Sequence, residues 1–166
     1  MTREDIFQVI IEFVELVEGK SSAQKKIIPL LVKNLDQLAL AYHFIDIRVS
    51  NAKDYPDPLH HSYDQIRFIV TAQFSTFGFY NVPHDIATKI CQTHFMTGDA
   101  IDDLADIVLA LKEILWRWQN TSIEDALWNY RFTFETHWGT HLRDLQRYVH
   151  DLMSESGWLI LNRDPL

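Results

Sequence analysis

The chain has 166 residues, of which 47% are apolar and 13% aromatic, and its formal net charge is −8. This length and apolar content are typical of one folded domain and exclude a disordered chain. The acidic charge argues against nucleic-acid binding and against binding to anionic membrane surfaces, because both require clustered Lys and Arg.

The first three predicted elements are α-helices, because apolar residues recur every three or four positions and turn-forming residues are few. The first helix is expected over about residues 3–18, with Thr2 as its N-cap and Gly19 just beyond its end. A second begins near residues 21–22, and its apolar stripe ends at Ile45. After a turn-rich stretch, a third helix is expected over about residues 62–77.

The middle of the chain has a less regular pattern. Residues 77–83 are aromatic and are interpreted as an irregular stretch, and residues 85–94 are interpreted as a short helix. No pair of segments shows the alternation and turn chemistry typical of a strand hairpin. This region is therefore expected to connect helices without forming a sheet.

The last two predicted helices are long. The fourth covers about residues 99–119, roughly 30 Å, and the fifth runs from Ser122 to about Ser154, roughly 50 Å. The fifth must overhang its neighbour or bend, and Gly139 is the expected site of a bend. A very short connection makes the two helices antiparallel. The predicted fold is therefore all-α, a single domain over residues 1–166 built as a bundle of five or six helices.

The cysteine count and the hydropathy bear on the compartment. Cys91 is the only cysteine, so no internal disulfide forms, which suits a reducing cytoplasm. No apolar run is long enough to span a membrane, and the acidic start of the chain does not resemble a signal peptide. A cytoplasmic protein without a membrane partner is expected.

An acidic cluster opens the fourth predicted helix. Asp99, Asp102, Asp103 and Asp106 have the spacing i, i+3, i+4, i+7, so they share one helix face. Like charges at this spacing repel one another, and a divalent cation, a basic partner or solvent can compensate. The pattern favours a solvated face that complements the helix N-terminus, and a binding site is the alternative.

A second cluster lies between Trp128 and His141. Arg131 and Glu135 are four residues apart and are expected to pair. His137 and His141 are also four residues apart, which lets two imidazoles reach one metal ion, or lets both fill the core margin and bond to a carboxylate. No Glu follows His137, so the zinc-protease pattern is absent. Core positions are predicted for the aromatic residues Trp128, Phe132, Phe134 and Trp138.

The antiparallel arrangement is expected to bring the two clusters together. The start of the fourth helix then lies beside the later part of the fifth, so Asp102 or Asp106 approaches His137, His141 or Arg131. Such contacts form either a structural clasp of charged hydrogen bonds or a divalent-metal site with mixed oxygen and nitrogen ligands. Both interpretations remain open at this point.

Several motifs resemble the bacterial family called domain of unknown function 5063. They are Asp102-Asp103-Leu104-Ala105-Asp106-Ile107, then Leu111-Lys112-Glu113, then the run from Trp128 to Leu142. The resemblance covers about residues 98–150; Thr140 stands where the family has a basic residue, and residues 77–97 are long for it. It implies a small helical bacterial protein with no established activity, in which the acidic and Arg-Glu-His clusters form one unit.

The predicted function is a non-catalytic interaction module that binds a protein partner or itself, with no metal or cofactor. The candidate binding residues are Asp102, Asp103, Asp106, Arg131, Glu135, His137 and His141. The alternative is a divalent-metal-dependent hydrolase, with Asp103, Asp106, His137 and His141 around the ion and Asp102 nearby. A purely structural motif is a third interpretation, and the sequence leaves open whether the protein is an enzyme.

Overall fold

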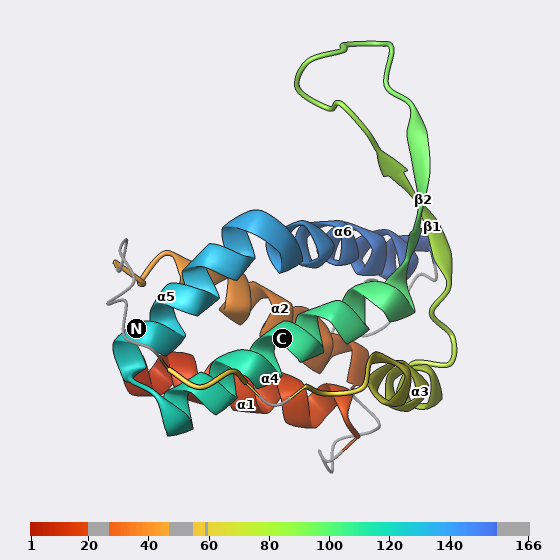
Figure 1. Cartoon of the computed structure of the whole chain (residues 1–166). Coiled ribbons are helices and arrows are strands. Elements are labelled where there is room, and N and C mark those ends of the chain that lie inside the picture. The colour runs from red at the N-terminus through yellow and green to blue at the C-terminus, as the bar shows by residue number, and fades with distance from the viewer. Residues whose placement is uncertain (20–26, 47–54, 59, 156–166) are drawn as a thin grey trace, which may run out of the picture.

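The computed structural model describes residues 1–19, 27–46, 55–58 and 60–155. Its elements, in chain order, are α1 (Arg3–Val17), α2 (Ile27–Tyr42), α3 (Tyr63–Gln73), β1 (Phe79–Pro83), β2 (Phe95–Asp99), α4 (Ala100–Asn120), α5 (Ile123–Thr133), the π-helix η2 (Phe134–Trp138) and α6 (Gly139–Glu155) (Figure 1). The predicted all-α class is confirmed, and a small two-stranded hairpin is added to the helical bundle.

Helix α1 begins and ends as its sequence predicts. The Thr2 hydroxyl accepts a hydrogen bond from the Asp5 backbone N–H at 3.1 Å, and the Asp5 carboxylate accepts one from the Thr2 N–H at 2.7 Å. This reciprocal pair is a capping box, which satisfies backbone donors that the helix leaves free. At the other end, Gly19 takes a φ of +73°, a conformation that glycine adopts at little cost.

Helix α4 lies at the centre of the bundle, where it contacts α1, α3, α5 and α6. Its inward face is fully buried at Leu104, Ile107, Leu111 and Ile114. The predicted bounds of this helix are confirmed to within a residue. The predicted start of the second helix lies outside the described residues. Among the helices that the structure does describe, none is both long and apolar enough to cross a membrane.

The hairpin of β1 and β2 corrects the prediction for residues 77–94. The strands are antiparallel, with Phe79 opposite Asp99 and Pro83 opposite Phe95, and no helix forms between them. The hairpin projects away from the helices (Figure 1). Gly98 lies opposite Tyr80, and a Cβ atom there would come within 2.6 Å of the Tyr80 ring. Glycine therefore gives that ring room to lie over the partner strand.

The predicted fifth helix is interrupted by the π-helix η2. Gly139 follows this turn, and its N–H donates to the carbonyl oxygen of Phe134, five residues earlier. A Cβ atom at Gly139 would lie 2.2 Å from that oxygen, so the turn requires glycine. The bend predicted at Gly139 thus takes the form of a π turn just before it. Beyond the turn, Val149 and Met153 are buried, and Tyr148 and Leu152 pack against the core while only partly buried.

Candidate metal centre

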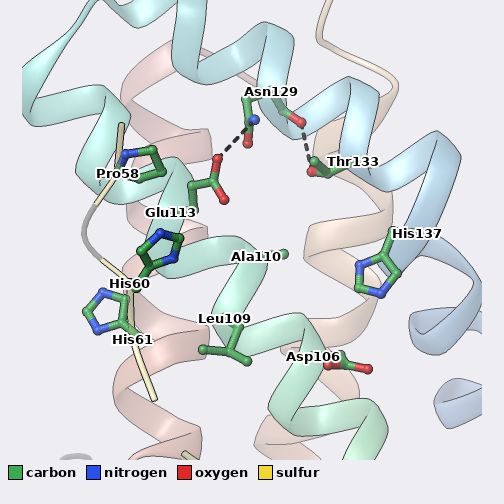
Figure 2. Close-up of a pocket in the computed structure, with 10 residues that line it drawn as sticks. All are labelled: Pro58, His60, His61, Asp106, Leu109, Ala110, Glu113, Asn129, Thr133 and His137. Carbon is green, nitrogen blue, oxygen red and sulfur yellow. Dashed lines mark hydrogen bonds between the residues drawn. The ribbon is translucent and has the colours of Figure 1, made fainter. Parts of the chain in front are cut away.

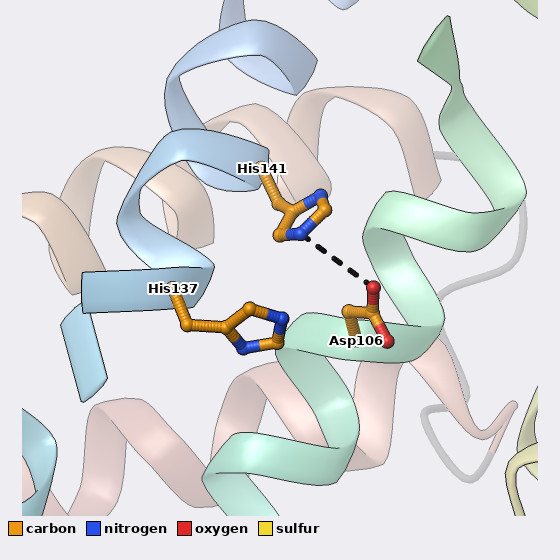
Figure 3. A group of neighbouring side chains, drawn as sticks. All are labelled: Asp106, His137 and His141. Atoms are coloured by element: carbon orange, nitrogen blue, oxygen red, sulfur yellow. Dashed lines mark ion pairs between the residues drawn. The ribbon is translucent and has the colours of Figure 1, made fainter.

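Three of the predicted site residues converge where α4 passes the π turn. Asp106 comes from α4, His137 from η2 and His141 from the first turn of α6. One ligand atom from each lies within 4.8 Å of the other two (Figure 3). The Nε2 atom of His141 is 3.5 Å from the Asp106 Oδ2, and the two imidazole centroids are 5.1 Å apart. The acidic and histidine clusters therefore meet as the antiparallel arrangement predicts.

Asp103 contacts the His141 ring at the nitrogen that does not face Asp106. Its side chain is only 8% exposed, and its Oδ1 lies 2.7 Å from the Nδ1 of His141. Its other oxygen accepts a hydrogen bond from the hydroxyl of Tyr80, on β1. Because Nδ1 is engaged by Asp103, the Nε2 of His141 is turned toward Asp106 (Figure 3). A carboxylate in this position fixes the tautomer and orientation of a metal-binding imidazole.

The surroundings of Asp103 bear on two interpretations of the acidic cluster. The fully solvated face is wrong for Asp103, which is buried. Its two oxygens contact His141 and Tyr80, so Asp103 is not one of the three groups whose ligand atoms converge. Asp106, by contrast, is partly buried and has only an imidazole beside it among the ion pairs of the described residues.

Burial and neighbouring charges shift the pKa values of two groups in the cluster. The hydrogen bond that the His141 ring donates to Asp103 raises the pKa of His141, against the opposing effect of burial. Burial raises the pKa of Asp106, and the nearby His141 only partly offsets this. Burial thus acts on both groups and favours the uncharged form of each. A cation bound at the centre would reduce the repulsion between Asp106 and the nearby carboxylates of Asp102 and Asp103.

Asp99, the N-cap of α4, and Asp102 in its first turn pair with Arg67 of α3. Its guanidinium lies 2.6 Å from Asp99 and 3.3 Å from Asp102, and Asp102 also accepts a hydrogen bond from Tyr63. Of the two aspartates predicted to approach the histidines, Asp106 does so, whereas Asp102 pairs with Arg67 and Tyr63. Arg67 carries no sequence signal for this role, since only the packing of α3 on α4 brings it there.

Arg131 and Glu135 form their predicted ion pair, at 3.0 Å, but away from the aspartates. Arg131 donates to the Ile45 carbonyl at 2.8 Å, and its guanidinium lies 5.2 Å from the centroid of the Tyr42 ring. The Tyr42 hydroxyl donates to Glu135 at 2.7 Å. This group holds the end of α2 against α5 and η2. The expected contact of Arg131 with the acidic cluster is wrong.

The aromatic residues of the second cluster divide between core and surface. Trp138 is fully buried, and its ring packs edge-on against Tyr130 and Phe134. Phe132 is 49% exposed, so its predicted core position is wrong. It stacks on the partly buried Trp128, with ring centroids 5.0 Å apart. The difference arises because Phe132 lies on the outer side of α5.

A pocket of about 330 Å³ opens beside the cluster, between α4 and the unit formed by α5 and η2. Asp106 and His137 form part of its wall (Figure 2). The pocket also has lining residues that the sequence did not single out, and these are Pro58, His60, His61, Leu109, Ala110, Glu113, Asn129 and Thr133. Two of the three candidate ligands, Asp106 and His137, thus face a space large enough for a small molecule.

Comparisons with known proteins identify a family and a similar fold. A family model described as "Domain of unknown function (DUF5063)" matches residues 2–155. A search of the curated proteins found no match. The crystal structure of protein BF1032 from Bacteroides fragilis has a TM-score of 0.71 to this chain, with 20% identity over 90% of each chain. This likeness shows that the two proteins share the fold.

Proposed function

Because the chain belongs to the DUF5063 family, a domain of unknown function, we propose a function from the site itself: a divalent transition-metal ion binds to Asp106, His137 and His141. The observation that carries the proposal is the convergence of one carboxylate and two imidazoles within 4.8 Å. The contact between Asp103 and His141 supports it, since the imidazole is already oriented for a ligand at Nε2.

The ligand types favour zinc or a related metal over magnesium. Imidazole suits Zn²⁺, Fe²⁺ and Cu²⁺, whereas magnesium prefers an all-oxygen environment. Ligand atoms at about 2.0–2.2 Å from one ion lie no more than about 4.4 Å apart. The observed cluster therefore needs only small side-chain rotations to close on an ion.

The number of protein ligands supports a catalytic centre over a structural one. Structural zinc sites have four protein ligands, while catalytic sites have three and keep a position for water or substrate. Here three ligands converge, and two of them, Asp106 and His137, line the pocket. A metal ion with an open position lowers the pKa of bound water to about 7 and polarises carbonyl or phosphoryl groups. Metal-dependent hydrolysis is the activity we propose.

Thermal unfolding of the full chain with and without metal tests the proposal. After treatment with a chelator, Zn²⁺ is expected to raise the unfolding midpoint more than Mn²⁺ or Mg²⁺, since a ligand of the folded state stabilises it by about 2.7 kcal/mol at a hundredfold excess over Kd. His137→Ala is expected to lose this response. His150→Ala, at an exposed histidine of α6, is the matched control and keeps it. An unchanged midpoint in the unsubstituted protein with all three metals overturns the proposal.

A second function is favoured by the surface of the hairpin. Five large apolar side chains are exposed there, at Phe79, Ile86, Ile90, Phe95 and Met96. An isolated two-stranded hairpin is only marginally stable, and its outer strand edges offer unpaired backbone groups. We propose that the hairpin associates with the hairpin of a second copy, which the interaction-module hypothesis also implies.

The distribution of charge supports a second copy of the chain as the partner of the hairpin. The molecule carries a net charge of −8, so two copies repel one another over most of their surfaces. The strand residues from Phe79 to Pro83 and from Phe95 to Gly98 carry no charged side chain, and in the loop between them Asp85 pairs with Lys89 at 2.7 Å. This part of the hairpin therefore has little net charge, so two acidic chains can meet there with little repulsion. The oligomeric state in solution tests this second proposal.

A further inference from the structure

The pocket beside the metal centre is a groove between two antiparallel helical segments. Residues of α4 line one side at intervals of three and four, and residues of α5 and η2 line the other at intervals of four. The groove is thus lined, from one end to the other, by Asp106 and His137, then Ala110 and Thr133, then Glu113 and Asn129 (Figure 2).

The end of the groove away from the metal centre is rich in hydrogen-bond acceptors. The Oε1 of Glu113 accepts from Arg117 at 2.9 Å and from the Asn129 amide at 3.4 Å. Asn129 is only 6% exposed, and its buried side-chain oxygen accepts no hydrogen bond from any described residue. A buried acceptor without a donor is costly, so this end of the groove is suited to a ligand that donates hydrogen bonds.

The middle of the groove offers few groups that can hydrogen-bond to a ligand. Ala110 contributes only a methyl group, and the Thr133 hydroxyl is already bonded to the Asn129 carbonyl oxygen at 2.7 Å. Leu109 adds an apolar wall. From Asp106 to Glu113 the helix rises by seven residues, or about 10 Å. A ligand that reaches both ends therefore has a short apolar stem of about that length.

The cation nearest this end of the groove, Arg117, is divided between two carboxylates. On the outer wall, burial lowers the pKa of His61, and the nearby Lys112 lowers it further. The guanidinium of Arg117 is 19% exposed and is shared between Glu113 and Asp125. An anionic group at the far end would face the Glu113 carboxylate, and a cationic or neutral donor is favoured over it.

We propose that the groove binds a small amine-bearing substrate, with a metal-coordinating carbonyl group at Asp106 and His137 and an amino group about 10 Å away at Glu113 and Asn129. This inference rests on the proposed metal centre and adds the substrate class. Short acyl compounds with a terminal amine have this chemistry. The carbonyl group takes the open metal position, and the amine donates to both acceptors.

Two matched hydroxamates test the substrate class on the zinc-loaded full chain. Aminohexanoyl hydroxamate and hexanoyl hydroxamate coordinate metal identically and differ only in the terminal amine. By titration calorimetry the amine-bearing probe is expected to bind at least tenfold more tightly, about 1.4 kcal/mol. Glu113→Gln is expected to shrink this ratio, whereas Glu15→Gln, on the exposed face of α1, leaves it unchanged.

A second variant separates a filled groove from a lost fold. Ala110→Leu is expected to retain zinc binding and to weaken both hexanoyl probes at least tenfold, while the short acetohydroxamate binds as before. Equal affinities of the two matched probes for the zinc-loaded protein overturn the substrate class and leave the metal centre standing. Failure of the unsubstituted chain to take up zinc overturns the metal centre, and the groove inference falls with it.

Discussion

Asp103 and Asp106 stand three residues apart on α4, and their surroundings give them different roles. Asp103 is buried, and its two oxygens contact His141 and Tyr80. Asp106 faces the pocket and lies 3.5 Å from the same imidazole. One carboxylate therefore orients a histidine, and the other is available to a metal ion. The identical side chains differ only in which neighbours the fold supplies.

The orienting role of Asp103 leads to the first prediction. Asp103→Asn keeps the shape of the side chain but removes the charge that holds His141, so zinc affinity is expected to fall about 10- to 100-fold. Asp102→Asn is the matched control, because Asp102 contacts Tyr63 and Arg67 and no histidine. Titration calorimetry measures both. Equal zinc affinity in the two variants would contradict the assigned role.

A second prediction concerns Asp144 on α6. Burial, and then the charge of Asp103, raise the pKa of Asp144 above its usual value near 3.8. A raised pKa in the folded state stabilises the protein below the unfolded pKa, and this contribution is lost as the pH rises through the folded pKa. Asp144→Asn is therefore expected to raise the unfolding midpoint at pH 7 and to lose this advantage as the pH approaches 4.

The control for this pH effect lies on the same helix. Asp151 has a side chain that is 62% exposed, so Asp151→Asn is expected to change the midpoint little at either pH. Thermal unfolding followed by circular dichroism at several pH values separates the two variants. A gain in Asp144→Asn that persists unchanged at pH 4 would show that burial of charge is not its cause.

The residues of the cluster were only partly predictable. The i, i+4 spacing of His137 and His141, and the antiparallel packing of their helix on α4, are local properties that the sequence contains. The contacts of Tyr80 and Arg67 with the aspartates are not local, since the hairpin and α3 must first dock on α4. Local sequence patterns do not predict how the hairpin and α3 dock on α4, so the sequence alone could not distinguish the role of Asp102 from that of Asp103.

At the scale of elements, the π turn is what places the two histidines. Its five residues, from Phe134 to Trp138, close hydrogen bonds one residue wider than in an α-helix. The turn contains His137, and His141 follows in the first turn of α6, so both imidazoles reach Asp106. Such turns are often found at functional sites. Gly139 makes the turn possible, because any Cβ there meets the Phe134 oxygen.

The effect of Gly139→Ala on stability is expected to be opposite to that of most Gly→Ala substitutions in helices. Gly→Ala inside a helix normally stabilises by about 1 kcal/mol. Gly139→Ala is instead expected to destabilise the protein by about 1–3 kcal/mol, as overpacking does, because its Cβ would lie 2.2 Å from a backbone oxygen. Gly78→Ala is the control, since a Cβ there meets nothing within 4 Å. Urea unfolding compares the two; a more stable Gly139→Ala would contradict the steric account.

The elements that the sequence predicted well are those with long, regular patterns. Helices α1 and α4 have an apolar face repeated over several turns together with recognisable caps. The hairpin was missed because each strand has only five residues, too few for alternation to stand out, and because one strand ends in Pro83. Its strands pair across an intervening loop, a contact that no local pattern records.

At the scale of the whole molecule, the fold separates two surfaces. The metal centre and its groove lie among the helices, whereas the apolar hairpin projects beyond them (Figure 1). Tyr80 joins the two, since it belongs to β1 and donates to Asp103. It also stacks on Tyr148 of α6, with ring centroids 4.8 Å apart. The base of the hairpin is therefore fixed to the helices by the same carboxylate that orients His141.

Self-association through the hairpin gives the whole-molecule prediction. The full chain is expected to form a dimer in light scattering coupled to size exclusion, and Phe95→Ser is expected to shift it toward the monomer by removing apolar surface. Phe68→Ser is the matched control, because Phe68 is 77% exposed but lies on α3. A monomer at all accessible concentrations, or equal effects of the two substitutions, would exclude the hairpin as the contact surface.

The π turn also determines which side chains of α6 face the core. One additional residue in a turn rotates every later side chain by about 100° around the axis. After the turn the core stripe runs through Leu142, Leu145, Val149 and Met153, whereas the register of α5 continued without the extra residue would favour positions one residue earlier. Deleting one residue between Phe134 and Trp138 is therefore expected to restore a regular helix but to rotate this stripe away from the core. We expect such a deletion to be tolerated only together with a second change that restores the register.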